Sequence, residues 1–193
     1  KDFLLDTGFR TMSGAGAQHF LKTIRDLRQK VGRNHLQEAL TGPWAYQDDR
    51  LTLRFDPQDD RRSALRWALA GDEPTRSVWG ANLLAAIAVA CFTSIPTGQG
   101  LQTIGFYGRR SREIAFRWPI WEEPVSLPVV RSLISLGDIQ KLPPANETSV
   151  ERLRIRQVQQ ARATLAARGI LEVYQSRRLT IGKIRNFAPA ESL

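Results

Sequence analysis

The segment from Ala81 to Ser94 is apolar on nearly every side, and it constrains the fold more than any other part of the chain. A helix of this composition has no polar face to turn towards water, so we expect it to be buried and to end at Pro96. Its longest apolar run, Leu83–Phe92, is too short to cross a bilayer. With 193 residues, the chain can bury such a helix in one medium domain or two small ones.

Several other segments have the apolar spacing of helices. In residues 13–31, apolar side chains recur on one face, with Ser13 as a candidate N-cap and Gly32 at the end. That stripe consists of Ala17, Phe20, Ile24, Leu27 and Val31. Three further helices are predicted at 34–40, at 127–136, where Pro128 suits the first turn, and at 149–168, an arginine-rich segment closed by Gly169.

Strand-like runs flank an arginine-rich turn in the middle of the chain. Residues 101–107 and 113–118 predict a β-hairpin with Arg109, Arg110 and Arg112 at its tip, and we expect Pro119 to end its second strand. Near the C-terminus, 170–174 and 179–184 have the composition of two short strands on either side of a turn.

These elements predict an α+β fold. We expect a mostly helical body with one or two β-hairpins and a long basic helix at the C-terminal end. Proline and asparagine in 142–146 are typical of a linker, which would separate an α+β domain, 1–141, from a basic helix with a short hairpin, 147–193.

Positive charge is concentrated in the second half of the chain. The formal net charge is +9, of which residues 98–193 carry +7 and residues 1–97 carry +2. Arginine predominates, and its planar guanidinium suits bidentate contacts with phosphate. The distribution favours nucleic acid as the partner, although a basic protein without such a partner is the alternative.

The residue types of common catalytic and metal sites are scarce. Cys91 is the only cysteine and lies in an apolar run, which indicates a core thiol and fits a reducing cytoplasm. His19 and His35 have no metal-ligand spacing with it, and we expect no cofactor. A nuclease metal site needs converging carboxylates, and the candidates are Asp48, Asp49, Asp56, Asp59, Asp60, Asp72 and Glu73. Such acids are also common in loops, and no phosphate-binding loop or nucleophile motif occurs, so we expect no catalytic activity.

Three basic groups are candidates for contacting nucleic acid. They are Arg109, Arg110 and Arg112; Arg152 and Arg156, one turn apart on the long helix; and Arg177, Arg178, Lys183 and Arg185. The alternative for each group is a set of solvated charges. The five tryptophans could stack on bases, but tryptophans in apolar patterns more often belong to the core.

Four phrases, in order, resemble one family. They are FDPQDDRRSALRW at 55–67, SVWGANLLAA at 77–86, IAFRWPIW at 114–121 and VVRSLISL at 129–136. Together they are similar to the C-terminal part of the large subunit of type I CRISPR interference complexes of the I-U/I-G kind. The shared features map to Asp56, Pro57, Asp60, Arg61 and Arg62, to Gly80, Ala81 and Asn82, and to Trp118 and Pro119. The resemblance covers residues 10–137.

The resemblance implies a non-catalytic subunit of an RNA-guided surveillance complex. Such a subunit would contact target DNA, guide RNA and the other subunits, and would stabilise the opened DNA of the R-loop. Arg61, Arg62 and Asn82 would then serve in structure or touch DNA. The chain lacks an initiating methionine, which is compatible with a domain of the large subunit, while a separate small subunit is the other reading.

Two other classes of function stay open. In a DNA-binding regulator, residues 149–185 would form a winged helix that prefers one palindromic site. In a nuclease, the acids named above would hold metal ions.

Overall fold

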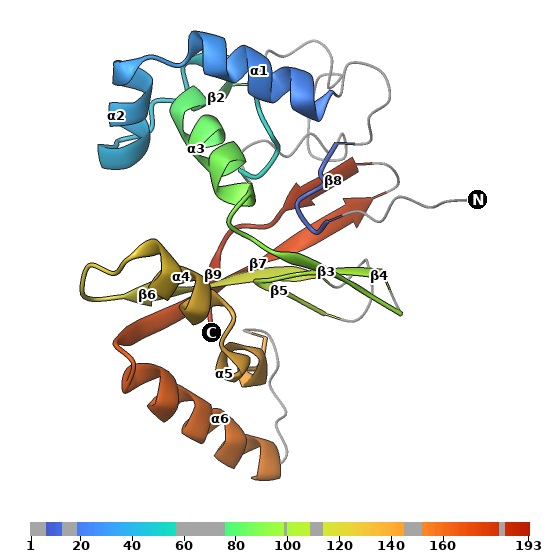
Figure 1. The fold of residues 1–193 in the computed structure, drawn as a ribbon, viewed down its shortest axis with the longest axis vertical. Coiled ribbons are helices and arrows are strands. Elements are labelled where there is room, and N and C mark those ends of the chain that lie inside the picture. The colour runs from blue at the N-terminus through green and yellow to red at the C-terminus, as the bar shows by residue number, and fades with distance from the viewer. Residues whose placement is uncertain are drawn as a thin grey trace, which may run out of the picture. The chain divides into compact units, whose positions relative to one another are not determined.

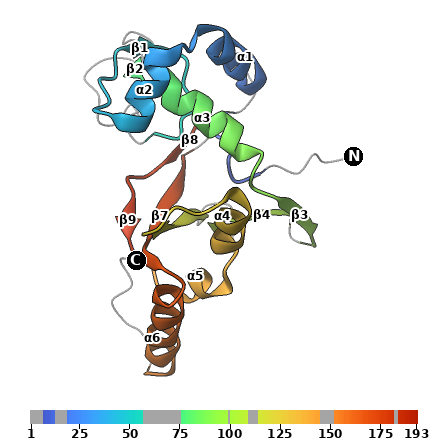
Figure 2. The ribbon, with the colours of Figure 1, turned by 60° about the vertical axis from the view of Figure 1, so that its left-hand side comes forward.

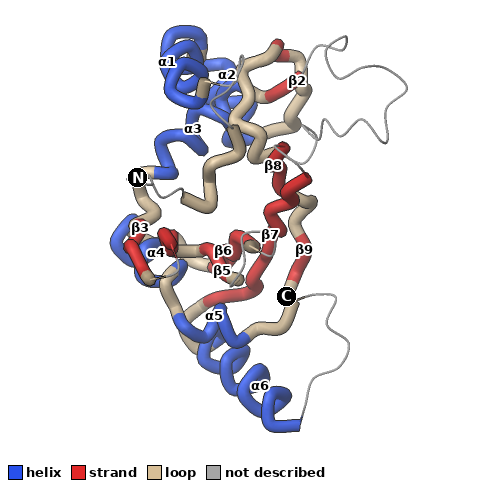
Figure 3. The backbone as a smooth tube through the Cα atoms, turned by 90° about the vertical axis from the view of Figure 1, so that its right-hand side faces the viewer, coloured by secondary structure: helices blue, strands red, loops and turns tan. Residues whose placement is uncertain are grey.

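The computed structural model describes residues 7–12, 19–56, 76–98, 100–108, 114–144, 152–181 and 184–193. Within these residues the protein is α+β, as the sequence predicts (Figures 1 and 3). The helices are α1 (Phe20–Lys30), α2 (Arg33–Thr41), α3 (Trp79–Val89), α4 (Leu127–Ile134), α5 (Gly137–Lys141) and α6 (Arg152–Ala166). The strands are β1 (Asp48–Asp49), β2 (Arg76–Ser77), β3 (Ser94–Thr97), β4 (Gly100–Thr103), β5 (Phe106–Tyr107), β6 (Ala115–Trp121), β7 (Ile170–Ile181), β8 (Ile184–Phe187) and β9 (Glu191–Ser192).

The chain forms two compact units, each assembled from segments that are distant in sequence. The first unit comprises residues 1–8, 92–178 and 188–193, and the second comprises 9–91 and 179–187. The segment 142–146, which the sequence analysis gives as a linker, falls within the first unit. Its first residue, Leu142, is buried in the core of that unit.

In the second unit, α1 and α2 pack against α3 (Figure 2). The predicted stripe of α1 is confirmed where it is described, because Leu27 is buried and Phe20 and Ile24 are half-buried. The predicted N-cap Ser13 lies outside the described residues. The start of α2 is closed by His35, whose Nδ1 accepts the N–H of Gly32 at 3.0 Å. This bond satisfies one of the donors that a helix leaves unpaired at its start.

Helix α3, which the sequence predicts over 81–94, is shorter and less buried than expected. It ends at Val89, and only its first turns are in the core, where Gly80, Asn82 and Leu83 are buried. Ile87 is 62% exposed, so the prediction of burial on every side was wrong. Ser94–Thr97 leave the helix to form β3, in which Pro96 lies opposite Leu101 of β4.

The main sheet has the strand order β5–β6–β7–β8, and β9 also pairs with β7. The pairs β5–β6, β6–β7 and β7–β9 are antiparallel. In the first unit, α5 and α6 pack against each other and help to cover one face of this sheet (Figures 1 and 2). The core between them consists of Leu133, Ile139, Leu142, Ala161, Leu165, Ile170, Val173 and Leu193.

The predicted hairpin is present, but its first strand is interrupted. Phe106 pairs with Phe116 and Tyr107 with Ala115, as expected for a hairpin between 101 and 118. The interruption lies at Gly105, whose φ of +83° suits glycine. The residues before it form β4, which pairs with β3 instead of β6. The three arginines of the tip lie outside the described residues.

Pro119 does not end its strand, contrary to our expectation. It lies inside β6, opposite Val173 of β7. The N–H of Arg117, two residues earlier, points to the β5 side and donates to Gly105 O at 2.8 Å. Backbone groups alternate along a strand, so the nitrogen of Pro119 points to the same side, where β5 has already ended. A proline is tolerated there because no ladder hydrogen bond is lost.

The C-terminus also differs from the prediction, because the chain ends in strands and not in a long basic helix. The helix expected at 149–168 is present as α6, but strands β7, β8 and β9 follow it. The two short strands that we expected at 170–174 and 179–184 are largely one continuous strand, β7. Its middle residues Gln175, Ser176 and Arg177 look like a turn in the sequence, yet each has a partner in β6. Pairing on the sheet thus overrides local turn propensity.

The close approach of α3 to α2 depends on Gly80. A Cβ atom at this position would overlap the backbone carbonyl of His35 and lie 3.0 Å from the Cβ of Ala39. We therefore expect Gly80→Ala to lower the free energy of unfolding by about 1–3 kcal/mol in urea denaturation. Gly137→Ala is the matched control, because Gly137 is also helical and a Cβ atom there would meet no other atom within 4 Å. Equal stability of both variants would contradict this close packing.

Candidate nucleic-acid interface

Helix α6 is the most basic element among those the structure describes. Its sequence carries Arg152, Arg154, Arg156 and Arg162 and no acidic residue. Ala161 and Leu165 are buried and attach the helix to the core of the first unit. Residues 154–157 are all exposed, so this part of α6 presents Arg154 and Arg156 to solvent.

Arg156 lies on the side of α6 opposite the core. It precedes Leu165 by nine residues, which is two and a half helical turns, and its side chain is exposed. Arg152 is one turn earlier on the same side, although only its backbone position is described. Because phosphates along one strand are several ångströms apart, two guanidinium groups at this spacing can follow one strand together.

Near the C-terminal end of α6, Asp138 of α5 partly neutralises the positive charges of Lys141 and Arg168. Asp138 Oδ1 lies 2.8 Å from Lys141 Nζ, and its Oδ2 lies 3.9 Å from Arg168 Nη1. These pairs are exposed and contribute little to stability. They nevertheless make Lys141 and Arg168 poorer candidates for phosphate contact than Arg156.

The structure separates the adjacent arginines of the third predicted group. Arg177 is half-exposed, and its Nε lies 3.4 Å from Glu191 Oε1. Arg178 is only 5% exposed, and its Nη1 donates to Gly8 O at 3.1 Å. Adjacent residues of a strand point to opposite faces, which explains the difference. The proposed surface role of Arg178 is therefore corrected to a structural one.

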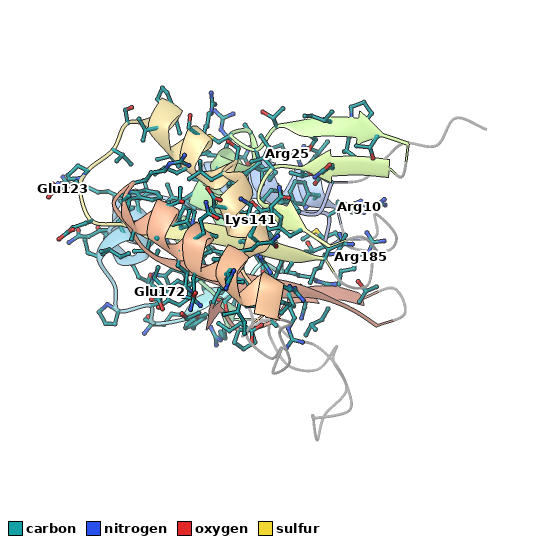
Figure 4. The ribbon with its side chains drawn as sticks, turned by 90° about the horizontal axis from the view of Figure 1, so that it is seen from below. Arg10, Arg25, Glu123, Lys141, Glu172 and Arg185 are labelled. Carbon is teal, nitrogen blue, oxygen red and sulfur yellow. The ribbon has the colours of Figure 1, made fainter. Side chains whose placement is uncertain are left out.

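The remaining members of that group are not in the first unit. Arg185 belongs to the second unit, where its Nη1 donates to Arg10 O at 3.4 Å; both residues are labelled in Figure 4. Lys183 lies outside the described residues, as do Arg109, Arg110, Arg112, Arg61 and Arg62. The candidate interface that the structure describes thus consists of α6, with Arg177 as a further surface cation of the same unit.

Asn82 has a structural role in the second unit. Its Oδ1 accepts the backbone N–H of Leu53 at 2.7 Å, and its Nδ2 donates to Val78 O at 3.0 Å. Its side chain is buried, and Leu53 beside it is fully buried. An amide carries both a donor and an acceptor, so this one side chain accepts from one backbone segment and donates to another.

Trp79, in the same Trp-Gly-Ala-Asn phrase, also has a structural role. The backbone N–H of Trp79 donates to Asp48 Oδ2 at 2.8 Å, which gives α3 a cap from outside the helix. The indole N–H of Trp79 donates to Asp49 O at 3.2 Å. The phrase therefore connects α3 to the segment from Asp48 to Leu53, through hydrogen bonds to backbone groups and to the Asp48 carboxylate.

The acids considered for a metal site have structural partners where they are described. Asp49 Oδ1 lies 2.9 Å from Arg76 Nη1, and Asp56 Oδ2 accepts the hydroxyl of Tyr46 at 2.7 Å. Burial, together with this bond to Asp56, raises the pKa of the Tyr46 phenol. In the described ranges, no group of three His, Cys, Asp or Glu side chains is placed to hold a metal ion.

The sequence analysis missed a basic surface on the second unit. Helix α1 exposes Lys22, Arg25 (labelled in Figure 4), Arg28 and Lys30, and Arg33 follows at the start of α2. Asp26 reduces this charge, because its carboxylate lies 2.7 Å from Lys22 and 3.5 Å from Arg25. The helical spacing of these residues in 20–33 was the signal, but the low net charge of the first half concealed it.

It also missed a buried arginine. The Arg117 guanidinium donates to Ile139 O at 2.8 Å, to Leu142 O at 3.0 Å and to Gln175 Oε1 at 3.2 Å. Its central carbon lies 5.3 Å from the ring centre of Tyr107. Burial lowers the pKa of Arg117 and raises that of Tyr107. The signal was its place in the alternating strand, between Ala115 and Pro119 on the buried face.

Comparison with known proteins identifies no relative. No protein family, curated protein or solved structure matches the chain. Among the helices described, none combines the length and the apolar character that a transmembrane span requires.

The contacts of Asn82 give a test of its role. We expect Asn82→Ala to lower the free energy of unfolding by about 1–3 kcal/mol, because the buried N–H of Leu53 loses its acceptor. Nucleic-acid affinity per folded molecule should be unchanged. Urea denaturation and fluorescence anisotropy measure the two quantities, with Asn34→Ala on the exposed face of α2 as the control. Lost binding at unchanged stability would assign Asn82 to the DNA interface instead.

Proposed function

We propose that this chain is a non-catalytic subunit of an RNA-guided type I CRISPR surveillance complex, of the I-U/I-G kind. Its task would be to contact and stabilise the opened target DNA through basic surfaces. The observation that carries the proposal is the exposed N-terminal half of α6, which bears arginines without acids while Ala161 and Leu165 hold the helix to a core.

The chemistry of α6 suits phosphate and not bases. Arginines on one solvent-facing side displace the counterions of a nucleic-acid backbone, which gives affinity at every sequence. Such binding is weak for a subunit alone, typically with Kd of about 10⁻⁴–10⁻⁶ M at physiological salt. Within a complex that weakness is useful, because base pairing with a guide RNA supplies the specificity.

The phrases that resemble the CRISPR family support its placement in that complex. Gly80 and Asn82 are both committed to packing α3 against backbone segments of the second unit. A phrase of this kind preserves a fold and supplies no reacting group, which agrees with a subunit that leaves cleavage to a separate enzyme.

The pairing of β7 favours this proposal over a winged-helix regulator. A wing is a hairpin that extends from a small helical domain to reach DNA. Here the strand after α6 pairs with β6 along Ile170–Arg177 and also pairs with β8 and β9. As an internal strand of a sheet, it lacks the free edge and reach of a wing.

The proposal is tested on the native complex and on the isolated chain. Affinity purification of the chain from its host should recover repeat-derived RNA together with several partner subunits. Recovery of the chain alone, with tight binding to one palindromic DNA site, would support the regulator instead.

A second test concerns catalysis. We expect no cleavage of single- or double-stranded DNA or of RNA when the purified protein is incubated with Mg²⁺ or Mn²⁺, as followed by gel electrophoresis of end-labelled substrates. Cleavage that disappears in Asp56→Ala or Asp60→Ala would contradict a non-catalytic subunit. Cleavage that survives both substitutions would be traced to a contaminating nuclease by its separation from the protein on a second column.

The role of α6 is tested by removing two arginines. We expect Arg152→Ala combined with Arg156→Ala to weaken binding to all DNA sequences about equally, and to flatten the dependence of log K on log salt by about 0.7 per lost contact on single strands. The melting temperature should be unchanged, because Arg156 faces away from the core.

The matched control is Lys141→Ala combined with Arg168→Ala. It removes the same net charge from the same unit, but from side chains that lie beside Asp138. Equal losses in both double variants would indicate a general charge effect and contradict a specific role for α6. Loss confined to one preferred sequence would favour the regulator.

A further inference from the structure

The sheet of the first unit carries a row of aromatic rings on the face opposite its core. On β6, Phe116 and Trp118 alternate with Ala115 and Arg117, so the two pairs point to different faces. Trp118 lies opposite Tyr174 of β7, which adds a third ring to the first pair. We call Phe116, Trp118 and Tyr174 the aromatic row.

The three rings are nearly parallel. Ring centres are 5.6 Å apart between Phe116 and Trp118, at an interplanar angle of 22°. Between Trp118 and Tyr174 they are 6.0 Å apart, at 21°. Core aromatic pairs often meet edge to face, whereas a run of parallel rings is the arrangement that a further flat ring can extend.

One end of the row is covered by other rings. The other, which we call the open end, has half-buried Trp118 and Tyr174 beside exposed residues. Phe92 and Phe106 pack at an angle against Phe116, with ring centres at 5.3 and 5.2 Å. Beyond Trp118 on the same face, Ile120 is 40% exposed. Ser192 of β9, which lies beside Tyr174, is also exposed.

The open end is held in place by hydrogen bonds. Glu172, labelled in Figure 4, precedes Tyr174 on the same face, and its carboxylate accepts the hydroxyl of Ser192. Its interaction with Tyr174 raises the pKa of the phenol, while the two hydroxyls lower the pKa of Glu172. The carboxylate thereby fixes Tyr174, and its negative charge repels phosphate from this end.

The other described tryptophans have different environments. Trp79 contacts Lys30 and His35 and donates its indole N–H to Asp49 O. Trp121 packs on the core of the first unit. Trp44 is 43% exposed, meets Tyr46 edge-on and donates its indole N–H to Ala39 O at 3.3 Å, so it provides an exposed tryptophan outside the row.

We propose that the open end of the aromatic row stacks on unpaired bases of single-stranded nucleic acid. Every nucleobase has a π face, so stacking tolerates any sequence, and only unpaired bases have that face available. Repulsion by Glu172 directs bases rather than phosphates to the rings, and the positive charge of the chain attracts the strand. The proposal rests on the proposed function and adds the single-stranded character of its ligand.

The aromatic row and the arginines of α6 serve different parts of a strand. Ala161 and Leu165 of α6 pack with Val173, which points to the face opposite Tyr174. The two surfaces therefore lie on opposite sides of the sheet and can be tested separately. Loss of a stacking ring changes affinity without changing the number of counterions released, whereas loss of an arginine changes both.

The experiment compares two oligonucleotides of about 12 nucleotides, an oligothymidylate and an abasic strand with the same number of phosphates, by fluorescence anisotropy. We expect the unsubstituted protein to bind the oligothymidylate about 5- to 100-fold more tightly. Trp118→Leu and Tyr174→Leu should remove most of that difference, leave the salt slope unchanged and leave affinity for duplex DNA unchanged. Trp118→Phe, which keeps a ring, should retain most of the preference for the oligothymidylate over the abasic strand. Trp44→Leu should bind both oligonucleotides as the unsubstituted protein does.

Two results would overturn the inference. One is equal affinity for the two oligonucleotides. The other is an unchanged preference for the oligothymidylate in folded Trp118→Leu and Tyr174→Leu. If either result is obtained while the Arg152/Arg156 double variant still binds nucleic acid more weakly than the unsubstituted protein, the proposed function stands and only this inference is overturned. If the unsubstituted protein binds no nucleic acid at all, both the inference and the proposed function are contradicted.

Should a leucine variant fail to fold by circular dichroism, the unsubstituted protein gives an independent answer. Photocrosslinking to an oligonucleotide with 5-bromodeoxyuridine should attach the strand to peptides of β6 or β7. Crosslinks found only in other parts of the chain would overturn the inference.

Discussion

The buried guanidinium of Arg117 organises the first unit. From β6 it reaches Gln175 of β7 and the backbone carbonyls of Ile139 and Leu142, so that one side chain joins two strands, α5 and the segment after it. An arginine stays charged in proteins, and removing it from water is costly unless its donors are satisfied. Here carbonyl and amide oxygens and the face of Tyr107 stabilise the charge.

The network continues from Arg117 to the end of the chain. Gln175 donates its Nε2 to Glu191 at 2.8 Å, and the same carboxylate lies near Arg177. Glu191 belongs to β9, and Leu193, two residues later, is buried in the core with its N–H bound to Val173 O. A single polar chain thus connects the interior of the sheet to its C-terminal strand. Fully satisfied networks of this kind favour one arrangement, because each displaced member would leave a buried group unpaired.

Much of the fold followed from periodicity in the sequence. The stripe of α1, the proline at the start of α4 and the alternation around the 101–118 hairpin each identified an element, because these signals depend on neighbouring residues alone. The segments that were assigned wrongly have structures that depend on residues distant in the sequence. The nitrogen of Pro119 lies where β5 has ended, and the turn-like residues before Arg178 are held straight by β6. Neither partner is visible in the local sequence.

The candidate site was predicted in part for the same reason. Helical spacing correctly placed Arg156 away from the core, since the face of a helix follows from counting residues. For Arg177 and Arg178, a turn was assumed, and a turn would have exposed both. A strand divides them between surface and interior, so the error in the element became an error in the site. Arg117 escaped notice because its burial depends on partners that are distant in sequence, among them the carbonyls of Ile139 and Leu142 and the side chain of Gln175.

The Trp-Gly-Ala-Asn phrase lies in the second unit, whereas helix α6 and the aromatic row lie in the first. The Trp-Gly-Ala-Asn phrase is committed to α3 and the segment from Asp48 to Leu53, and every polar contact described for it ends on the protein itself. Glycine and asparagine suit these positions, because a larger side chain than glycine does not fit at 80 and an apolar side chain at 82 cannot form the bonds. The phrase is therefore an argument for a shared fold. The argument for nucleic acid comes from the first unit, where Arg156 of α6 and the aromatic row lie on opposite sides of one sheet, away from the core. Helix α6 lies outside the segment 10–137 that carries the resemblance, so binding by α6 would keep its meaning even if the resemblance proved to be one of fold alone.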